Sequence, residues 1–454
     1  MRINSGVVLL TLTCLLSGCG SQRVKMAAPE AGDARDRSQA SSPVDINVVK
    51  RWQALIEHPQ LMALIQQALT NNPEQHQYQS RIEQAEALLK SRRAQDELKV
   101  EIATNYSHQQ TKRDGFGAFG LDGRLSYELD IWGRRDANQQ AALLAWQAAS
   151  YQKQVAEIAL TSDMVQSWIE IVALQRELAL LQQQVKTNQT ILQLQKSRLA
   201  GGVARVLDVL QQQEVLAQTQ ALLPDIESRL ALAKHRLQLL AGSPSTPIDT
   251  SEATYPEFAL TPEAGVTSDI LYFRPDIEAV WRQYHQGEWL AEASRDERWP
   301  TFELSAVLSS GGASVSDLIE EWVLRLVASA TYQVWDGGEQ SAQELLADAQ
   351  AREKYHIYRQ RVQQAIYEIH TSQLEEHYQR QALAKLQKQR AAADAVLKQA
   401  ELSYASGEAS YVNVLNGLLS VQSLTRRHIE EQKTLVLHQL AWLRATGLAT
   451  EFTN

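Results

Sequence analysis

The chain has 454 residues and a formal net charge of −9, from 44 basic and 53 acidic side chains. This acidic balance offers no basic face for phosphates, which argues against nucleic-acid binding. Gln, Ala, Leu and Glu are abundant, only 11 residues are proline, and long stretches lack a helix breaker. The composition therefore excludes a plain pair of globular domains and favours extended helices.

The first 18 residues have the form of a secretory signal peptide. Arg2 precedes an apolar run from Gly6 to Leu16, which closes with Leu16-Ser17-Gly18-Cys19. The run is shorter than the roughly 20 apolar residues that cross a bilayer, and its end resembles a bacterial lipobox. That resemblance implies cleavage before Cys19, acylation of this cysteine with palmitate among the chains, and outer-membrane sorting because Gly20 follows. The alternative is an ordinary signal peptide with a chance cysteine.

Cysteine usage limits the chemistry of the mature chain. Cys14 leaves with the signal peptide and Cys19 carries lipid, so no thiol remains for a disulfide, a nucleophile or a metal site. We expect no metal and no cofactor other than the covalent lipid. No later stretch of about 18 apolar residues occurs, so any membrane crossing is expected to use strands.

An internal repeat with a lag of 205 residues organises the rest of the chain. Leu199–Leu210 aligns with Tyr404–Leu415, where Gly202 matches Gly407 and 407 − 202 = 205. The same lag pairs Gly133 with Gly338 and Gly242 with Gly447, whereas Asn72-Pro73-Glu74 pairs with Arg274-Pro275-Asp276 at a lag of 202. Such a repeat predicts two copies of one architecture, each a helix, two strands, a very long helix, a glycine turn and a return helix.

The repeat sets the expected domain boundaries. A segment rich in proline, serine and threonine from Gly242 to Pro262 joins the two halves. We expect a signal peptide at 1–18, a lipidated linker at 19–51, the first repeat at 52–242, a linker or equatorial segment at 243–270, the second repeat at 271–447 and a tail at 448–454.

Four segments alternate between apolar and polar side chains, as strands with unlike faces do: 98–106, 125–129, 302–308 and 322–334. Their lengths suit tilted membrane strands. The glycine-rich segments 115–123 and 311–316 are expected to be extracellular turns between the strands of each pair. The alternative is a soluble antiparallel sheet with one wet face.

Four strands cannot close a barrel, and an open sheet edge is not tolerated in lipid because its backbone groups have no partners. Several chains must then share one barrel. Two chains would give eight strands and a filled interior, whereas three would give twelve strands and a lumen.

Neither Pro nor Gly occurs from Arg134 to Ala200 or from Glu339 to Ser406. At 1.5 Å per residue, each segment can form a helix of about 100 Å. Apolar residues in the first segment keep a near-3.5 spacing, which predicts a coiled-coil seam with Gln, Lys and Glu on the water-facing surface: Ile171, Leu174, Leu178, Leu181, Val185, Leu192 and Leu199. The alternative, a cytoplasmic coiled coil, leaves the signal peptide and the strands unexplained.

Several motifs resemble the TolC-like outer-membrane efflux factors, in particular the lipidated branch typified by OprM and NodT. They are the Arg274-Pro275-Asp276-Ile277 box, the run from Arg295 through Trp299-Pro300, the segment Tyr127–Arg134 and the two glycine turns. The resemblance extends from about Trp52 to Gly447. Val280-Trp281 departs from the usual Ala-Glu after the box, and the chain stops soon after Gly447, so the exported cargo is not inferred from the family.

The resemblance implies a mainly α chain with membrane β-strands. Three chains form a 12-stranded outer-membrane β-barrel, with four strands per chain, continuous with a long periplasmic α-helical coiled-coil barrel. It implies a lipid-anchored protein of the cell outer membrane that extends into the periplasm and passively exports drugs or other small toxic compounds. The implied partners are two further copies, outer-membrane lipid, a periplasmic membrane-fusion adaptor and an inner-membrane pump of the RND type.

The two glycine turns are expected to form the periplasmic tip, since glycine ends a helix by adopting positive φ and leaves small side chains that a partner can approach. The expected adaptor contacts are Leu199, Gly201, Gly202, Ala204, Tyr404, Ser406, Gly407 and Ala409; the alternative is that they only cap helices. Family members constrict this end with acidic residues, which implies a periplasmic gate at Asp208 and its repeat mate Asn413. The alternative for Asp208 is a solvated helix face.

Three rival functions are considered. An enzyme is not expected, because the sequence lacks Gly-x-Ser-x-Gly, His-Glu-x-x-His and a phosphate loop. A structural envelope lipoprotein would tether layers through its coiled coil but would not need the strands. Within the export class, the alternative to small-molecule efflux is an outlet for type I protein secretion or for metal efflux.

Overall fold

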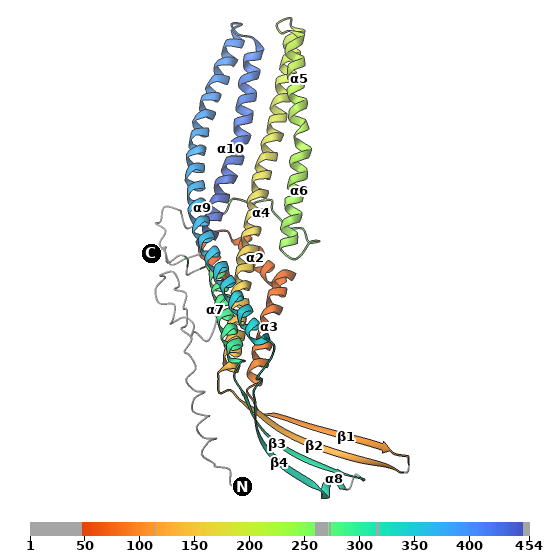
Figure 1. Cartoon of the computed structure of the whole chain (residues 1–454). Helices are drawn as coiled ribbons and strands as arrows, with labels where there is room; N and C mark the ends of the chain where they lie inside the picture. The colour runs from red at the N-terminus through yellow and green to blue at the C-terminus, as the bar shows by residue number, and fades with distance from the viewer. Residues whose placement is uncertain (1–47, 113, 259–270, 272–273, 315–316, 448–454) are drawn as a thin grey trace. The chain divides into compact units, whose positions relative to one another are not determined.

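A computed structural model describes residues 48–112, 114–258, 271, 274–314 and 317–447 (Figure 1). The predicted signal peptide, the lipidated Cys19, residues 259–270 of the predicted linker and the tail 448–454 lie outside these residues. In chain order the elements are α1 Val48–Leu55, α2 Pro59–Asn71, α3 Pro73–Ala94, β1 Lys99–Gln110, β2 Gly115–Leu129, α4 Arg134–Ala200, α5 Val206–Ala221, α6 Leu223–Leu240, α7 Pro275–Asp296, β3 Thr301–Gly312, α8 Asp317–Glu320, β4 Trp322–Thr331, α9 Glu339–Ala405 and α10 Tyr411–Ala445.

The two long helices are present as predicted. Each has 67 residues without interruption and begins after a glycine in the left-handed region, Gly133 or Gly338. The element order of the first half, α3, β1, β2, α4 and a return helix, recurs in the second half as α7, β3, β4, α9 and α10. The repeat seen in the sequence is therefore a structural repeat.

The return helices differ between the halves. In the first half the return helix breaks at Leu222 into α5 and α6, whereas α10 runs unbroken for 35 residues. Pro224 explains the break, because proline has no N–H to donate and its ring clashes with the carbonyl four residues before it.

β1, β2 and β3 are longer than the alternation predicted, β4 ends at Thr331 and not at residue 334, and one turn was placed wrongly. Residues 115–123 belong to β2 and pair with 102–110 of β1, so they are strand and not loop. The glycines give room to β1 side chains, because a Cβ at Gly117 would lie 2.6 Å from the Tyr106 hydroxyl and one at Gly120 would lie 2.0 Å from Asn105 Oδ1. The glycines that suggested a loop therefore leave space for side chains of the neighbouring strand.

The four strands form one antiparallel sheet in the order β1-β2-β3-β4. In the register, Val100 lies opposite Leu125, Leu125 opposite Ala306, and Ala306 opposite Leu326. The same face of the sheet therefore receives an apolar side chain from every strand.

The helices next to the strands also lie side by side in chain order (Figure 1). Next to the strands, α3 contacts α4, α4 contacts α7 and α7 contacts α9. Farther from the strands, α5 and α6 contact α4, α4 contacts α10 and α10 contacts α9. Within the described residues, β1, α3 and the α5–α6 pair therefore lie at one edge of the sheet and of the row of helices. The strand β4 and the helix α9 lie at the other edge.

The largest hydrophobic core lies where α1 and α2 pack on the middle of α4 and on the ends of α6 and α10. Trp168 of α4 is fully buried, stacks edge-on against His58 at 5.1 Å, and donates from Nε1 to the Thr254 carbonyl at 3.0 Å. The fully buried Trp52 and Leu61 complete this core. Among the described helices, none combines the length and the apolar character needed to cross a membrane.

Candidate functional site

The sheet has one apolar face and one polar face. Leu304, Leu324 and Leu326 are 45%, 56% and 77% exposed in the single chain, so the apolar face is uncovered. On the polar face, Arg124 forms an ion pair with Glu303 at 2.8 Å, and Arg325 occupies the same row as Arg124. This division is that of membrane strands, whose apolar face meets lipid and whose polar face lines a lumen.

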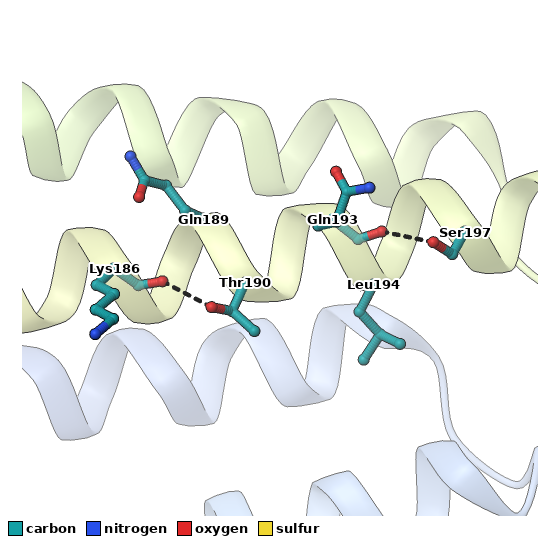
Figure 2. A pocket seen from close by; sticks show the side chains of 6 residues that line it. All are labelled: Lys186, Gln189, Thr190, Gln193, Leu194 and Ser197. Atoms are coloured by element: carbon teal, nitrogen blue, oxygen red, sulfur yellow. Dashed lines mark hydrogen bonds between the residues drawn. The ribbon is translucent and has the colours of Figure 1, made fainter.

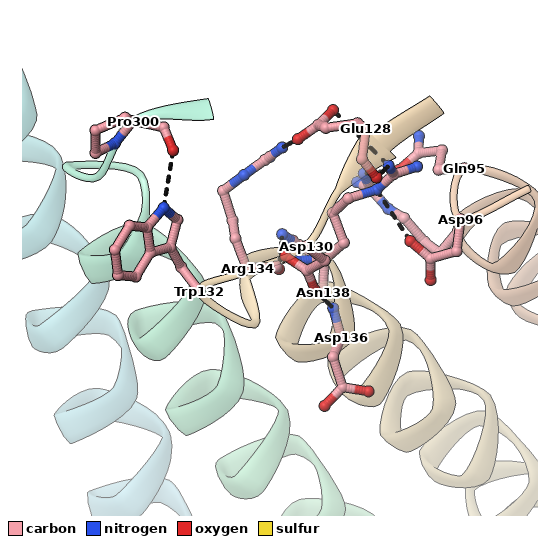
Figure 3. A network of polar contacts seen from close by, with 11 residues as sticks. Gln95, Asp96, Glu128, Asp130, Trp132, Arg134, Asp136, Asn138 and Pro300 are labelled. Carbon is pink, nitrogen blue, oxygen red and sulfur yellow. Dashed lines mark hydrogen bonds and ion pairs between the residues drawn. The ribbon is translucent and has the colours of Figure 1, made fainter. Parts of the chain in front are cut away.

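The strand ends join the long helices through a tight elbow (Figure 3). Asp130 accepts hydrogen bonds from the backbone N–H groups of Arg135 at 3.1 Å and Asp136 at 2.9 Å, which caps α4. Trp132 donates to the Pro300 carbonyl at 2.8 Å and stacks on Trp299 with ring centroids 5.1 Å apart. The first and second repeats are thereby fastened to each other where the sheet ends.

The second repeat uses the same capping device. Asp336 accepts from the N–H groups of Gly338 and Gln340, both at 2.8 Å. These backbone hydrogen bonds, with that from Gln340 the largest effect, hold the pKa of Asp336 below its ordinary value. The positive end of the helix dipole also stabilises a carboxylate at the start of each long helix.

The two predicted tips are built alike. Gly202 and Gly407 have φ values of 74° and 82°, in the left-handed region that favours glycine. The Val203 N–H donates to the Arg198 carbonyl at 2.9 Å, and the Glu408 N–H donates to the Ser403 carbonyl at 2.9 Å. These are C-terminal caps of the Schellman type, so the prediction that glycine ends both long helices is confirmed.

The predicted contact residues at the tips differ in exposure. Gly201, Gly202, Ser406 and Gly407 are exposed, whereas Leu199, Ala204, Tyr404 and Ala409 are half-buried. Tyr404 faces the first hairpin: its hydroxyl donates to Gln195 Oε1 at 3.1 Å, and the Arg198 guanidinium lies 4.5 Å from its ring centroid. The contact residues nearest to solvent are therefore the turns themselves.

Asp208 and Asn413 occupy the same place in the two return helices but have different surroundings. Asp208 is 3% exposed, accepts from the Arg205 N–H at 3.1 Å and pairs with the Arg205 guanidinium at 3.1 Å. Asn413 is exposed. In one chain Asp208 thus caps α5, and a ring of these residues at a gate stays a prediction.

A buried polar layer, which the sequence analysis missed, ties the first hairpin (α4 with α5) to the second (α9 with α10). Asn188 is fully buried; its amide donates to the Thr219 hydroxyl at 2.9 Å and accepts from Gln422 Nε2 at 3.1 Å. Gln212 accepts from the Tyr411 hydroxyl at 2.5 Å. Each amide is satisfied, as buried polar groups must be.

The expectation that glutamines cover the water-facing surface was wrong for this layer. Gln184, Asn188 and Gln195 are 5%, 0% and 2% exposed. They fall at the same heptad-like spacing as Leu181 and Leu192 of the predicted seam. A polar side chain in seam register was the signal that could have revealed the layer.

The Arg274-Pro275-Asp276 box forms a buried ion cluster. The Arg274 guanidinium binds Asp276 at 2.8 Å, Glu368 at 2.6 Å and the Ala445 carbonyl at 2.9 Å, and Arg361 also pairs with Asp276. The cluster borders a cavity of about 600 Å³ between α4, α9 and the end of α10. It anchors the start of α7 to α9 and to the last turn of α10.

Folding stability should fall at acid pH through Asp276. Desolvation raises the pKa of this carboxyl, but the ion pairs with Arg274 and Arg361 outweigh it, so the net pKa is below the ordinary value of 3.8. A depressed folded-state pKa stabilises the fold above the unfolded-state pKa, and this stabilisation is lost as pH falls through the folded-state pKa. Urea midpoints measured on either side of pH 4 should decline more steeply in the wild type than in Asp276→Asn. Equal slopes would contradict the assignment.

A shallow groove of about 410 Å³ runs along α4 near the tip (Figure 2). Its polar side chains bond within their own helix: the Thr190 hydroxyl donates to the Lys186 carbonyl at 3.0 Å, and the Ser197 hydroxyl donates to the Gln193 carbonyl at 3.1 Å. Because local backbone satisfies these groups, the groove is not a built ligand site.

Known proteins share the sequence features described above. A profile of the family described as outer membrane efflux protein matches residues 64–243. The pyoverdine export outer membrane protein OpmQ of Pseudomonas aeruginosa is 25% identical, across 96% of this chain and 94% of OpmQ.

Solved structures share the fold. The outer-membrane channel OprN superposes with a TM-score of 0.82 at 21% identity, covering 94% of this chain and 98% of OprN. The outer membrane protein VceC of Vibrio cholerae gives a TM-score of 0.79 at 21% identity, covering 86% of this chain and 96% of VceC.

These similarities confirm the predicted fold of the chain, which is mainly helical and carries one sheet of four strands. They also confirm the prediction of an outer-membrane efflux channel. Residues 64–243 of the chain match the outer membrane efflux protein family, whose TolC-like members its motifs resemble.

Proposed function

We propose that three copies of this chain form the outlet duct of a tripartite efflux system. The duct receives small toxic molecules, such as drugs, from an inner-membrane pump of the RND type through a periplasmic adaptor. The observation that carries the proposal is the direct junction, at the capped elbows, of a sheet with an uncovered apolar face to two helices of 67 residues each. At about 1.5 Å per residue, each helix spans about 100 Å beyond the membrane.

The adaptor would bind at the two glycine turns. Gly201, Gly202, Ser406 and Gly407 are exposed and have at most a small side chain, so a helical hairpin of the adaptor can approach the backbone closely. Positive φ at Gly202 and Gly407 makes both turns intolerant of larger residues. This supports the same docking geometry at both tips of each copy.

The gate would lie just inside these tips. Asp208 and Asn413 begin the return helices, and three copies would bring three of each to the same level of the duct. Like charges brought together raise the energy of the closed ring, while the Arg205 guanidinium at 3.1 Å partly offsets the charge of each Asp208. The duct itself would be passive, with energy supplied by the pump.

Planar-bilayer recording of the purified protein in detergent tests the proposal, after its mass has been measured. We expect a trimer with low single-channel conductance and higher conductance in Asp208→Asn. The asparagine side chain keeps an oxygen that can accept the hydrogen bond from the Arg205 N–H, so this change removes the charge but keeps the capping acceptor at the third position of α5. Asp208→Ala removes both.

The pair of variants separates two roles of Asp208. If the charge holds the gate, both variants should conduct more than the wild type. If only the cap matters, Asp208→Ala alone should do so, through fraying of α5. A monomer, or a trimer that never conducts, would reject the duct.

A further inference from the structure

We propose that His58 is a pH-sensitive switch, which holds the start of α2 and the linker segment 249–258 against the middle of α4 while its ring is neutral and loosens them when the ring is protonated. The inference concerns contacts within one chain, so it does not depend on the proposed duct. The linker segment follows α6 and leads toward the second repeat. The switch therefore acts where the two repeats are joined.

Three parts of the fold meet at the His58 ring. Its Nδ1 accepts a hydrogen bond from the Leu61 N–H at 3.3 Å, which caps the start of α2. Its Nε2 lies 3.3 Å from the Thr254 hydroxyl of the linker segment. The ring also packs edge-on against the fully buried Trp168 of α4, with centroids 5.1 Å apart. One side chain thus joins a helix end, the linker segment and the largest core.

These contacts require one form of the imidazole. Nδ1 can accept from the Leu61 N–H only when it carries no proton, so the ring is neutral and its proton lies on Nε2, which donates to Thr254. A second proton would turn Nδ1 into a donor that faces another donor. The Leu61 N–H then loses its acceptor, and the start of α2 loses its cap.

The residues on either side of His58 carry this change to the linker segment. The Glu57 N–H donates to the Glu257 carbonyl at 3.3 Å, near one end of the segment. The Gln60 amide, in the first turn of α2, donates to the Asp249 carbonyl at 2.8 Å, at the other end. Because both donors flank the capping histidine, a loosened start of α2 weakens the attachment of the segment at both ends.

Within the described residues, the elements around the ring provide no partner that would neutralise a positive charge on it. On α4, Glu170 pairs with Lys433 at 3.1 Å, and on the linker segment the Asp249 carboxylate accepts from the Ser251 N–H at 2.9 Å. α2 has no charged residue. His58 forms no ion pair with the titratable or charged groups of α1, α4, the linker segment and the ends of α6 and α10: Lys50, Arg51, Glu57, Asp163, Glu170, Lys234, His235, Arg236, Asp249, Glu252, Tyr255, Glu257, His438 and Arg444.

The surroundings of the ring determine the direction of the switch. Burial lowers the pKa of His58 below its ordinary value of 6.5, and a hydrogen bond with backbone opposes this with a smaller effect. The contacts of the neutral ring are therefore complete above the pKa of an exposed histidine, and they weaken as the pH falls from there through the lowered pKa. A groove of about 500 Å³, bordered by His58 and Met62, lets water and protons reach the ring.

Hydrogen–deuterium exchange of the full-length protein in detergent, read by mass spectrometry, tests the switch. Exchange is compared at about pH 5.5 and about pH 7.5, after correction for the pH dependence of exchange in an unfolded chain. We expect corrected exchange of peptides 59–66 and 249–258 to be several-fold faster at the lower pH. A peptide from the middle of α9 should exchange equally at both, because acid loosens only the contacts around His58.

Two histidine variants with a shared substitution identify the titrating group. His58→Asn supplies a capping oxygen that does not titrate, so both peptides should stay protected at the lower pH. His235→Asn is the matched control, because His235 is exposed on α6 and bonds only within its own helix, to Gln238 at 3.1 Å. This control should keep the pH dependence of the wild type.

A third variant imitates the protonated ring. His58→Arg carries a permanent charge and cannot accept the Leu61 N–H, so peptides 59–66 and 249–258 should already exchange fast at about pH 7.5. If this variant does not fold, His58→Asn still decides. Equal corrected exchange of the wild type at both pH values, an unchanged pH dependence in His58→Asn, or faster exchange spread equally over α9 would each overturn the inference.

Discussion

Replacing Leu326 by arginine should prevent most of the protein from assembling in membranes, although this side chain is 77% exposed in a single chain. Leu326 lies midway along β4 and on the apolar face, opposite Ala306. A cationic side chain on the lipid face at the bilayer midplane costs about 2–4 kcal/mol, and each of three copies would carry one. For a surface facing water the same substitution would cost less than about 0.5 kcal/mol.

The adjacent residue is the control. Val327 lies on the polar face of the same strand, in the row of Ser305, so Val327→Arg should be tolerated. Both variants are folded into phospholipid vesicles, and the folded fraction is followed during urea titration by the gel shift between unheated and boiled samples. Equal effects of the two variants would show that the two faces meet the same solvent, which contradicts a membrane barrel.

Periodicity predicted the elements whose signal is continuous along the chain. The absence of glycine and proline defined α4 to the residue and α9 to within one residue, because a segment of 67 residues without turn residues satisfies its backbone hydrogen bonds within itself as a helix. The alternation of 302–308 and 322–334 placed β3 and β4 for the same reason. Long, regular patterns leave few alternative structures.

Local composition misled where tertiary packing decides the conformation. The glycines of 115–123 suggested a turn, but their lack of a side chain serves Tyr106 and Asn105 on the neighbouring strand. Only the pairing partner reveals this, and the partner is not encoded in the segment itself. The buried amides Asn188 and Gln212 were missed in a similar way, since their hydrogen-bond partners lie on other helices.

The site residues were predicted in part. The turns at Gly202 and Gly407 followed from the repeat, because two glycines at equivalent places after two long helices can only end those helices. The capping role of Asp208 required the position of Arg205 in three dimensions.

Replacing Arg274 by alanine should give the largest loss of stability in the helical part of the protein. Arg274 is 4% exposed and binds two carboxylates and a backbone carbonyl. Its removal leaves Asp276 with Arg361 alone and the Ala445 carbonyl without its donor. Breaking a buried ion pair from one side typically costs about 3–5 kcal/mol.

The exposed Arg427 is the matched control for Arg274, because it also pairs with a carboxylate, Glu431 at 3.1 Å, but with 64% of its side chain exposed. Arg427→Ala should cost less than about 1 kcal/mol. Arg274→Lys should fall between the two, since lysine keeps the charge but not the forked donor geometry. Urea unfolding at neutral pH, followed by the helical circular dichroism signal, measures all three. If Arg274→Ala proved no more harmful than Arg427→Ala, the box would not anchor α7 to α9 and α10, and the second hairpin would need another attachment to the strand-bearing half.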